Sequence, residues 1–403
     1  MNKNNSNNKK WYVLVFIAVL IVSNIATFVF TNLITIAVGD KVIVQAKDAH
    51  TADFITKMLN LKNEIQTSYY KDVDEQALFD GALAGMFDAV GDPYTAYYNE
   101  DQFSTYLEQL EGSYVGIGVV VTMSDDDRVT IVSPIDGSPG QKAGLASGDI
   151  IMAVDGEEIK GLNLEEVVAL IKGEEGTPVE ITVLKRNSGE EINMSIVREE
   201  IVMTSVSSQV YENIGYMTIS QFEPYTFEEF ERQLDELIAQ GVEGIVFDLR
   251  DNPGGMMNAV VDMLDRIMGE SVIVYTQDKQ GNREYERSTD RQKLELPMAV
   301  IINEGSASAA EIFAGALQDT GEGVIVGTTS FGKGIVQRMS DYRDGTGYKI
   351  TISEYFTPNG RNIHGIGIEP DIIVEIDEEL LYSQEYRLED DEQFLKAVEA
   401  VRE

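Results

Sequence analysis

Residues from about 200 to 376 alternate between strand-like and helix-like patterns, and this alternation constrains the fold more than any other feature of the sequence. Ile214 to Ser220 and Gly244 to Leu249 are apolar runs of strand length, and a segment with helical spacing follows each of them. Repeated strand–helix units predict a layered α/β core in which the loops leaving the strand ends carry the chemistry. Two small-residue loops stand at such junctions, D-L-R-D-N-P-G-G at 248–255 and G-S-A-S-A-A-E at 305–311.

Two further regions precede this core. Residues 48–110 have apolar side chains at helical spacing and are interrupted at 91–94 by Gly-Asp-Pro-Tyr, which predicts a small helical region. Residues 112–198 combine short strand patterns with one helix that begins at Asn163, where Glu166 completes a capping box. This second region is predicted to form a compact, partly open barrel.

The N-terminus carries a long uncharged segment. Residues 11–38 contain no charged side chain, and Lys3, Lys9 and Lys10 precede them. Since roughly 20 apolar residues cross a bilayer, we expect a transmembrane anchor with the N-terminus inside and the rest of the chain outside the cytoplasm. A cleaved signal peptide is the alternative, because the small residues near Ala37 resemble a cleavage site.

The composition excludes several classes of function. The 69 acidic residues outnumber the 31 basic ones, for a net charge of −38, and such a surface repels nucleic acid. There is no cysteine, so thiol catalysis, disulfides and cysteine metal sites are excluded. The only histidines are His50 and His364. Nothing in the sequence indicates a metal site or a cofactor.

The loop at 305–311 suits nucleophilic chemistry. A small-residue turn that enters a helix exposes the hydroxyl of Ser308 and several backbone N–H groups that have no partner within the helix. Such donors stabilise an oxyanion, and the glycines of the 248–255 loop offer a second set.

A serine nucleophile needs a base, and Lys333 and His364 are the two candidates. Lysine acts as a base only when burial lowers its pKa, and the small neighbours Gly332 and Gly334 permit close packing. On a strand, Gln337 would share a face with Lys333 and could orient its amine.

Each of these residues also has a purely structural interpretation. Ser308 with Glu311 forms an S-x-x-E capping box, which requires no catalysis. A lysine between two glycines is usually a solvated turn residue, and Gln337 fits an ordinary surface strand. Spacing alone leaves both interpretations open.

The motifs taken together resemble the carboxyl-terminal processing (tail-specific) proteases of peptidase family S41, in the PDZ-containing bacterial type. The resemblance rests on the order of G-D-P-Y-T-A-Y-Y, E-G-S-Y-V-G-I-G, S-P-G-Q-K-A-G-L-A-S-G-D-I-I, D-L-R-D-N-P-G-G, N-E-G-S-A-S-A-A-E, G-T-T-S-F-G-K-G-I-V-Q and T-P-N-G-R-N-I-H-G-I-G-I-E-P-D. It implies a core similar to the crotonase and Clp-protease layered fold.

The resemblance also implies roles for individual residues. Ser308 is the implied nucleophile, Lys333 the general base and Gln337 its partner. The implied oxyanion hole combines the Ala309 amide with a glycine amide from Gly254 or Gly255.

A PDZ module holds an extended peptide by its terminal carboxylate, and Gly116, Ile117 and Gly118 fit the carboxylate loop. The expected partners are therefore protein or peptide substrates with accessible C-terminal tails. By resemblance, the helical region and the acidic tail pair two subunits into a homodimer.

The expected fold is thus a multi-domain α/β chain. Its parts are a cytoplasmic N-terminus, a transmembrane anchor, a helical N-terminal region, an inserted PDZ-like domain, a protease core and a C-terminal acidic helix, at 1–10, 11–38, 39–110, 111–198, 199–376 and 377–403. The expected function is a serine endopeptidase with a Ser–Lys pair that cleaves exported or membrane proteins.

Rival functions lack support in the sequence. A catalytically silent PDZ scaffold would have lost Ser308 or Lys333, and a trypsin-fold protease would need a His and an Asp ahead of a G-D-S-G serine.

Overall fold

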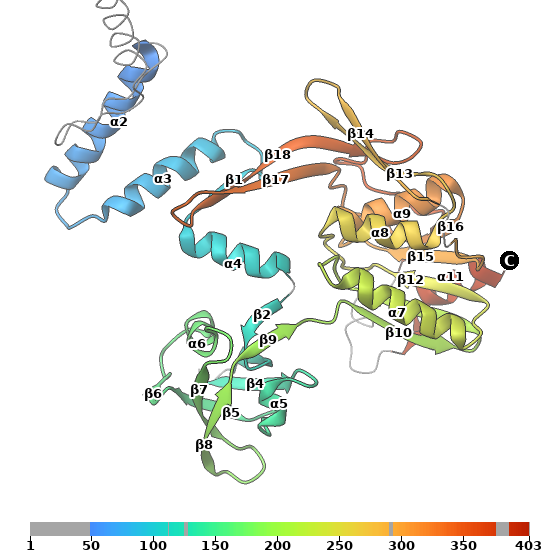
Figure 1. Ribbon diagram of the computed structural model, residues 1–403, viewed down its shortest axis with the longest axis horizontal. Helices are drawn as coiled ribbons and strands as arrows, with labels where there is room; N and C mark the ends of the chain where they lie inside the picture. Colours follow the sequence, from blue (N-terminus) through green and yellow to red (C-terminus); the bar gives the residue numbers. More distant parts are fainter. Residues whose placement is uncertain (1–48, 112, 125–127, 290–292, 376–386, 403) are drawn as a thin grey trace, which may run out of the picture. The chain divides into compact units, whose positions relative to one another are not determined.

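The computed structural model describes residues 49–402, apart from 112, 125–127, 290–292 and 376–386 (Figure 1). The chain divides into two compact units, and the break falls after Leu83. The described helices and strands are α2 (Ala49–Ser68), α3 (Glu75–Asp88), β1 (Ala96–Tyr98), α4 (Glu100–Glu111), β2 (Ser113–Gly116), β3 (Val119–Met123), β4 (Val129–Pro134), α5 (Pro139–Lys142), β5 (Ile150–Val154), β6 (Glu157–Glu158), α6 (Leu164–Ile171), β7 (Pro178–Leu184), β8 (Glu191–Val197), β9 (Glu199–Val202), β10 (Val206–Tyr211), β11 (Ile214–Ile219), α7 (Thr226–Ala239), β12 (Gly244–Asp248), α8 (Met257–Ile267), β13 (Val272–Asp278), β14 (Arg283–Arg287), β15 (Met298–Ile302), α9 (Ala309–Thr320), β16 (Gly323–Gly327), β17 (Ile335–Asp341), β18 (Gly347–Phe356), β19 (Ile372–Ile373), η1 (Leu388–Asp390) and α11 (Glu392–Arg402).

A six-stranded sheet forms the centre of the core, in the order β10-β11-β12-β15-β16-β19. All neighbouring strands are parallel except β10 and β11. Strands β12 and β15 are buried along their whole length, which explains their continuous apolar runs. The layered α/β architecture predicted from the alternation is therefore confirmed.

Helices cover both faces of this sheet. Helices α7, α8 and α9 lie side by side (Figure 1), and their apolar side chains join the largest core cluster, which includes Phe230, Met263 and Phe313. The C-terminal helix α11 packs Phe394, Ala397 and Val401 on the opposite face, against strands β12, β15 and β16.

A buried arginine links α11 to the loop after β12. Arg250 pairs with Asp248 on its own loop and with Asp391, which lies 2.8 Å away and precedes α11. The Arg250 guanidinium also donates to Gln393 at 3.1 Å. The end of the chain therefore braces the loop that leads to Gly254 and Gly255.

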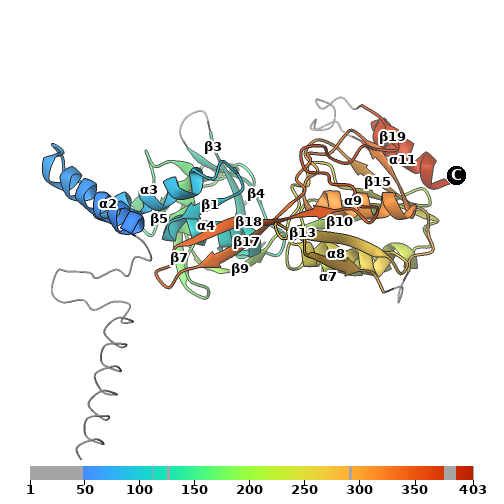
Figure 2. The same ribbon diagram turned by 90° about the horizontal axis from the view of Figure 1, so that it is seen from above.

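A second sheet extends from the core as a ribbon (Figure 2). Strands β17 and β18 form a long antiparallel hairpin, β1 pairs with β18 at one end, and β13 and β14 complete the sheet. The segment that contains β1 is thus fixed to the hairpin that follows Lys333.

The predicted barrel is a separate module with its own core. Its sheet runs β3-β4-β5-β7-β8, with β6 paired to β5 and with α5 and α6 packed against it. The predicted capping box is formed, because Glu166 N–H donates to Asn163 Oδ1 at 2.9 Å and Asn163 N–H donates to Glu166 Oε2 at 2.7 Å. Asp149 is buried in this module, where it accepts hydrogen bonds from the amides of Ala146 and Arg186 and pairs with Lys185.

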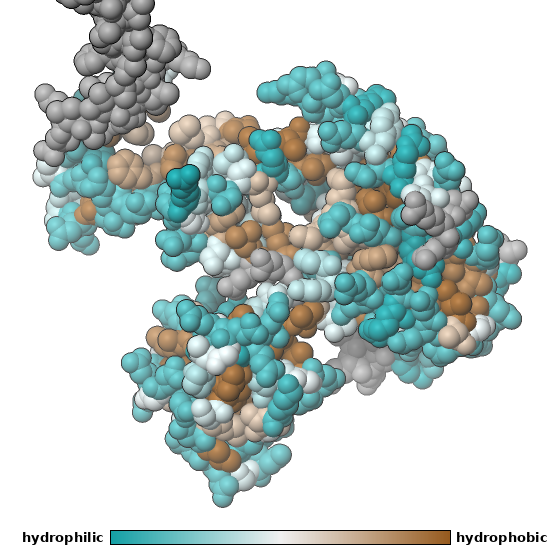
Figure 3. All heavy atoms as spheres, in the orientation of Figure 1, coloured by the Kyte–Doolittle hydropathy of each residue, from teal (hydrophilic) through white to brown (hydrophobic). Residues whose placement is uncertain are grey.

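Polar residues dominate the visible surface. Figure 3 shows hydrophilic residues over most of the visible face, with smaller apolar areas between them.

The expectation of a transmembrane helix requires correction. No helix in the described part of the chain is long and apolar enough to cross a bilayer, and residues 11–38, on which the expectation rested, lie outside that part. The described part of the chain is a mixed α/β multi-domain fold with no membrane-spanning helix. The expectation of a single-pass cell-membrane protein with its catalytic domain outside the cytoplasm is corrected with it.

Candidate active site

Two loops at the C-terminal ends of neighbouring parallel strands form the centre of the site. The first follows β12 and the second follows β15. Hydrogen bonds join them, because the buried Ser306 hydroxyl donates to the Leu249 carbonyl at 2.7 Å and the Ala307 amide donates to the Asn252 backbone carbonyl at 2.9 Å. The two loops predicted to carry chemistry are therefore in direct contact.

Ser308 stands at the start of α9 with an unusual backbone. Its φ of 53° and ψ of −113° differ from the extended conformation of an ordinary N-cap residue. A positive φ on a serine costs energy, and such strain is concentrated at functional sites. The strained turn places Ser308 against the first loop, since a Cβ built on Gly254 would lie 2.7 Å from the Ser308 Cβ.

Two backbone N–H groups beside Ser308 are available to a ligand. In the described part of the chain, the amides of Gly255 and Ala309 donate no hydrogen bond. The amide of Gly254 is different, because it donates to Asn252 Oδ1 at 2.8 Å. Of the two glycines expected to contribute an amide, only Gly255 has a free one.

The carboxylate of Glu311 connects the serine turn to the lysine loop. It is fully buried, and its Oε2 accepts the amides of Ser308 at 2.9 Å and Lys333 at 2.8 Å. Its Oε1 accepts the Ser330 hydroxyl at 2.6 Å and the Gly332 amide at 2.7 Å. Four donors therefore converge on one side chain.

Tyr355 makes a second connection between the same two segments. Its hydroxyl lies 2.9 Å from the Ser308 carbonyl and 2.6 Å from the Lys333 carbonyl. Burial, together with the charge of Glu311, raises the pKa of Tyr355 well above its usual value, so the hydroxyl keeps its proton. The backbones of Ser308 and Lys333 are thus linked through their amides by Glu311 and through their carbonyls by Tyr355.

Lys333 is half-buried, and its electrostatic environment favours the neutral amine. Burial lowers the pKa of Lys333, the positive charge of Lys349 lowers it further, and Glu311 acts in the opposite direction. Its Nζ lies 5.0 Å from the centre of the Tyr94 ring. Among the described residues, no hydrogen bond joins this nitrogen to the Ser308 hydroxyl in this conformation.

In the described part of the chain, no hydrogen bond joins the side chain of Gln337 or His364 to Ser308 or Lys333. Lys333 lies just before β17, and the register with β18 shifts between Val336 and Gln337 because β18 has one extra residue there, so the shared strand face expected for 333 and 337 stays a prediction. The Gln337 amide instead donates to the Ile335 carbonyl at 3.3 Å. The His364 side chain is exposed.

A hollow lies beside the PDZ-like loop. It has a volume of about 220 Å³ and lies between Gly116–Gly118, strand β3 and helix α6, with Val121, Val168 and Ile171 in its wall. In the described structure the amides of Ile117 and Gly118 donate no hydrogen bond. All three expected substrate-binding residues therefore line one apolar groove.

The sequence does not predict the contacts that three residues make with Ser308 or Lys333. Glu311 was recognised only as half of a capping box, and Tyr94 only as part of the break at 91–94. Tyr355 was not singled out, because its contacts join segments far apart in the chain. No pattern of local spacing indicates such contacts.

Comparison with known proteins agrees with this architecture. The model of peptidase family S41 matches residues 213–374, a PDZ domain model matches 130–185, and a model of the activating protease CtpB N-terminal domain matches 20–102. The carboxy-terminal processing protease CtpA of Bacillus subtilis is 35% identical over 370 residues, which cover 91% of this chain and 77% of that protein.

Two further matches are also named as C-terminal processing proteases. The carboxy-terminal processing protease CtpB of Bacillus subtilis is 36% identical over 315 residues, which cover 77% of this chain and 65% of that protein. A solved structure of the photosystem II D1 C-terminal processing protease is 29% identical, with a TM-score of 0.47 over 80% of this chain and 87% of that one.

The fold, the paired loops and these relatives define a serine peptidase that carries a PDZ domain. The chain belongs to peptidase family S41, and the peptidase interpretation is supported over a silent scaffold.

Proposed function

We propose that the chain is an endopeptidase that cleaves proteins with accessible C-terminal tails, with Ser308 as nucleophile and Lys333 as general base. The observation that carries this assignment is the shared Glu311 oxygen, which fixes the backbones of both residues to one point. The free amides of Gly255 and Ala309 support an oxyanion hole beside the serine.

The proposed reaction follows from this arrangement. The neutral Lys333 amine removes the proton of the Ser308 hydroxyl as the oxygen attacks the peptide carbonyl carbon. The amides of Gly255 and Ala309 donate to the developing oxyanion. The Lys333 ammonium then protonates the leaving amine, and water repeats the sequence on the acyl-enzyme. Gln337 is proposed to orient the amine once the lysine side chain turns toward Ser308.

The PDZ groove supplies a way to hold the substrate. The unpaired amides of Ile117 and Gly118 match a terminal carboxylate, and the apolar wall of the groove matches an apolar last side chain. Lys172, whose Nζ lies 5.1 Å above the Tyr114 ring, adds positive charge at the same groove.

The division into domains and the homodimer are part of the same proposal. The helical region, the PDZ module, the core and the C-terminal helix keep the boundaries given above. Helix α2 exposes Phe54, Leu61 and Ile65, which supports a role for this region in pairing two copies. Light scattering on the purified chain tests this, and a monomer at all concentrations would reject the dimer.

The catalytic assignment is tested by incubating the full chain with casein, an unfolded protein substrate. The Ser308→Ala and Lys333→Ala variants are assayed in parallel after circular dichroism has confirmed that they are folded. The proposal expects cleavage by the parent alone. Activity in the Ser308→Ala variant would show that Ser308 is only a helix cap.

A further inference from the structure

The side-chain nitrogen of Lys333 rests on an aromatic ring from a distant part of the sequence. Its Nζ lies 5.0 Å from the centre of the Tyr94 ring, within the range of a cation–π interaction. Both side chains are half-buried, which strengthens such a contact relative to an exposed one.

The turn that carries Tyr94 is held in place by a network of hydrogen bonds. Asp92 Oδ1 accepts the Tyr94 amide at 2.9 Å, while Asp92 Oδ2 accepts the hydroxyls of Thr95 and Thr351, each at 2.6 Å. The Thr351 amide donates back to Thr95 at 3.0 Å, and β1 continues from this turn as a partner of β18. Tyr94 is therefore fixed to the strand beside the lysine loop.

The Lys333 backbone is fixed as well, so only its four-carbon stem can move. The amide is bound to Glu311 and the carbonyl to Tyr355, and Gly332 and Gly334 on either side are buried. From this anchored backbone the flexible stem can direct the nitrogen either to the ring or to Ser308.

The two positions differ in the charge that they favour. A ring face attracts an ammonium and has no comparable attraction for a neutral amine. The Ser308 hydroxyl, by contrast, requires the neutral amine as its base.

We propose that Tyr94 is a positioning residue for Lys333, whose ring holds the protonated side chain and releases the neutral amine toward Ser308. This rests on the proposed assignment of Lys333 as general base.

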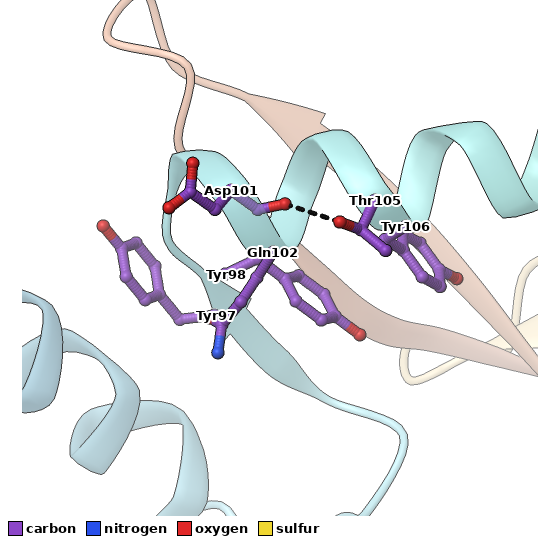
Figure 4. Close-up of a pocket in the computed structure, with 6 residues that line it drawn as sticks. All are labelled: Tyr97, Tyr98, Asp101, Gln102, Thr105 and Tyr106. Atoms are coloured by element: carbon purple, nitrogen blue, oxygen red, sulfur yellow. Dashed lines mark hydrogen bonds between the residues drawn. The ribbon is translucent and has the colours of Figure 1, made fainter. Parts of the chain in front are cut away.

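The other charged and titratable groups around Lys333 come from several elements, and they are unchanged in the variants below. Lys349, whose charge acts on Lys333, lies on β18 and stacks over Tyr98 and Tyr106 at 5.7 and 4.8 Å. Figure 4 shows these two tyrosines beside a hollow of about 430 Å³ between β1 and α4. The remaining groups are Glu311 on α9, Tyr355 on β18, Asp92 in the turn and His364 in the loop packed against Gly334.

The test measures kcat/KM against pH for the full chain with a fluorogenic peptide that ends in a free apolar residue. Tyr94→Phe keeps the ring and should follow the parent. Tyr94→Leu keeps apolar bulk without a ring face, so the Lys333 ammonium loses stabilisation. The acid limb of the profile, where kcat/KM rises with pH, should therefore move about 0.5–1 pH unit lower. On that limb the rate should rise about 3- to 10-fold. Tyr342→Leu, at an exposed tyrosine on the β17–β18 hairpin, should leave the limb unchanged.

A second series preserves the shape of the side chain. Phenylalanines with increasing fluorination at position 94 weaken the negative ring face, so the acid limb should move lower step by step. An identical acid limb in Tyr94→Leu, Tyr94→Phe and the fluorinated proteins would overturn the inference.

Controls separate this inference from the proposed function on which it rests. Ser308→Ala and Lys333→Ala should be inactive at every pH. If either keeps the parent's pH profile, the proposed catalytic pair is wrong. If both are inactive while the Tyr94 series shows no shift, the pair stands and only the role of Tyr94 is rejected.

Discussion

Ser308 and Lys333 donate their backbone amides to the same carboxylate oxygen, Oε2 of Glu311. The two residues belong to different loops, and the shared acceptor fixes the two loops relative to each other. A side chain that local spacing identifies as a helix cap therefore also assembles the site.

Replacement of Glu311 should destabilise the core and abolish activity. Glu311→Ala leaves four donors without an acceptor, two of them buried and two partly buried, so we expect a loss of about 3–5 kcal/mol in the free energy of unfolding. Glu311→Gln keeps the shape but places an NH₂ group against donors, and a loss of about 1–3 kcal/mol is expected. Denaturant unfolding measures both values. Glu236→Ala, at an exposed ion pair on α7, is the control and should change stability by less than about 0.5 kcal/mol.

The oxyanion hole is tested at Gly255, which has a φ of 140° and whose Cβ would overlap the Phe222 carbonyl. Gly255→Ala must displace the loop and its free amide, so kcat should fall by about 10²–10³ with little change in peptide affinity. Gly281→Ala supplies the control, because Gly281 also has a positive φ but lies in an open hairpin turn. Equal kcat values for the two variants would remove Gly255 from the proposed site.

The PDZ groove should distinguish a free C-terminus from a blocked one. A peptide with an apolar last residue should bind at least about tenfold more weakly when its carboxylate is amidated, since the loop amides then lack a charged acceptor. Gly118→Ala should abolish this difference, because its Cβ would overlap Ser138 and displace the loop. Fluorescence anisotropy gives the affinities, and the exposed site Val132 provides a neutral Val132→Ala control. Equal affinity for the two peptides would contradict carboxylate recognition.

The PDZ module should lose stability in acid through Asp149. Burial acts to raise the pKa of Asp149, but hydrogen bonds from Lys185 and from the amides of Arg186 and Ala146 outweigh it and hold the pKa below its usual value. A carboxyl group whose pKa is lower in the folded state stabilises the fold above its unfolded pKa of about 3.9. That contribution is lost as the pH falls through the folded pKa.

Asp149→Asn should accordingly destabilise the module by about 1–3 kcal/mol at pH 7, and the difference from the parent should vanish in strong acid. Hydrogen exchange in strands β4 and β7 measures this locally. A difference that stays constant down to pH 2 would exclude the ionised carboxylate as its source.

Local pattern was sufficient to predict much of the fold. The buried strands β12 and β15, the α6 capping box and the two loops after parallel strands follow from hydrophobic runs and turn chemistry, which are properties of neighbouring residues. The contacts of Glu311 and Tyr355 depend on segments that meet only in the folded chain, so spacing could not predict them.

The local structure narrows one expectation at the site and leaves another as a prediction. The shared strand face of Lys333 and Gln337 stays a prediction, because Lys333 lies just before β17 and the extra residue at the register shift belongs to β18. Gly254 and Gly255 were equivalent by sequence, and the Asn252 side chain distinguishes them by accepting the Gly254 amide.

The most direct test of the Ser–Lys assignment is peptide cleavage by Lys333→Arg. Arginine keeps a positive charge and a long stem at this position but cannot give up its proton, so it cannot act as a general base. The account predicts a folded protein whose kcat/KM is at least about 10²–10⁴ lower than that of the parent. A Lys333→Arg protein that retains activity within about tenfold of the parent would contradict the account, because Lys333 would then act only through its charge.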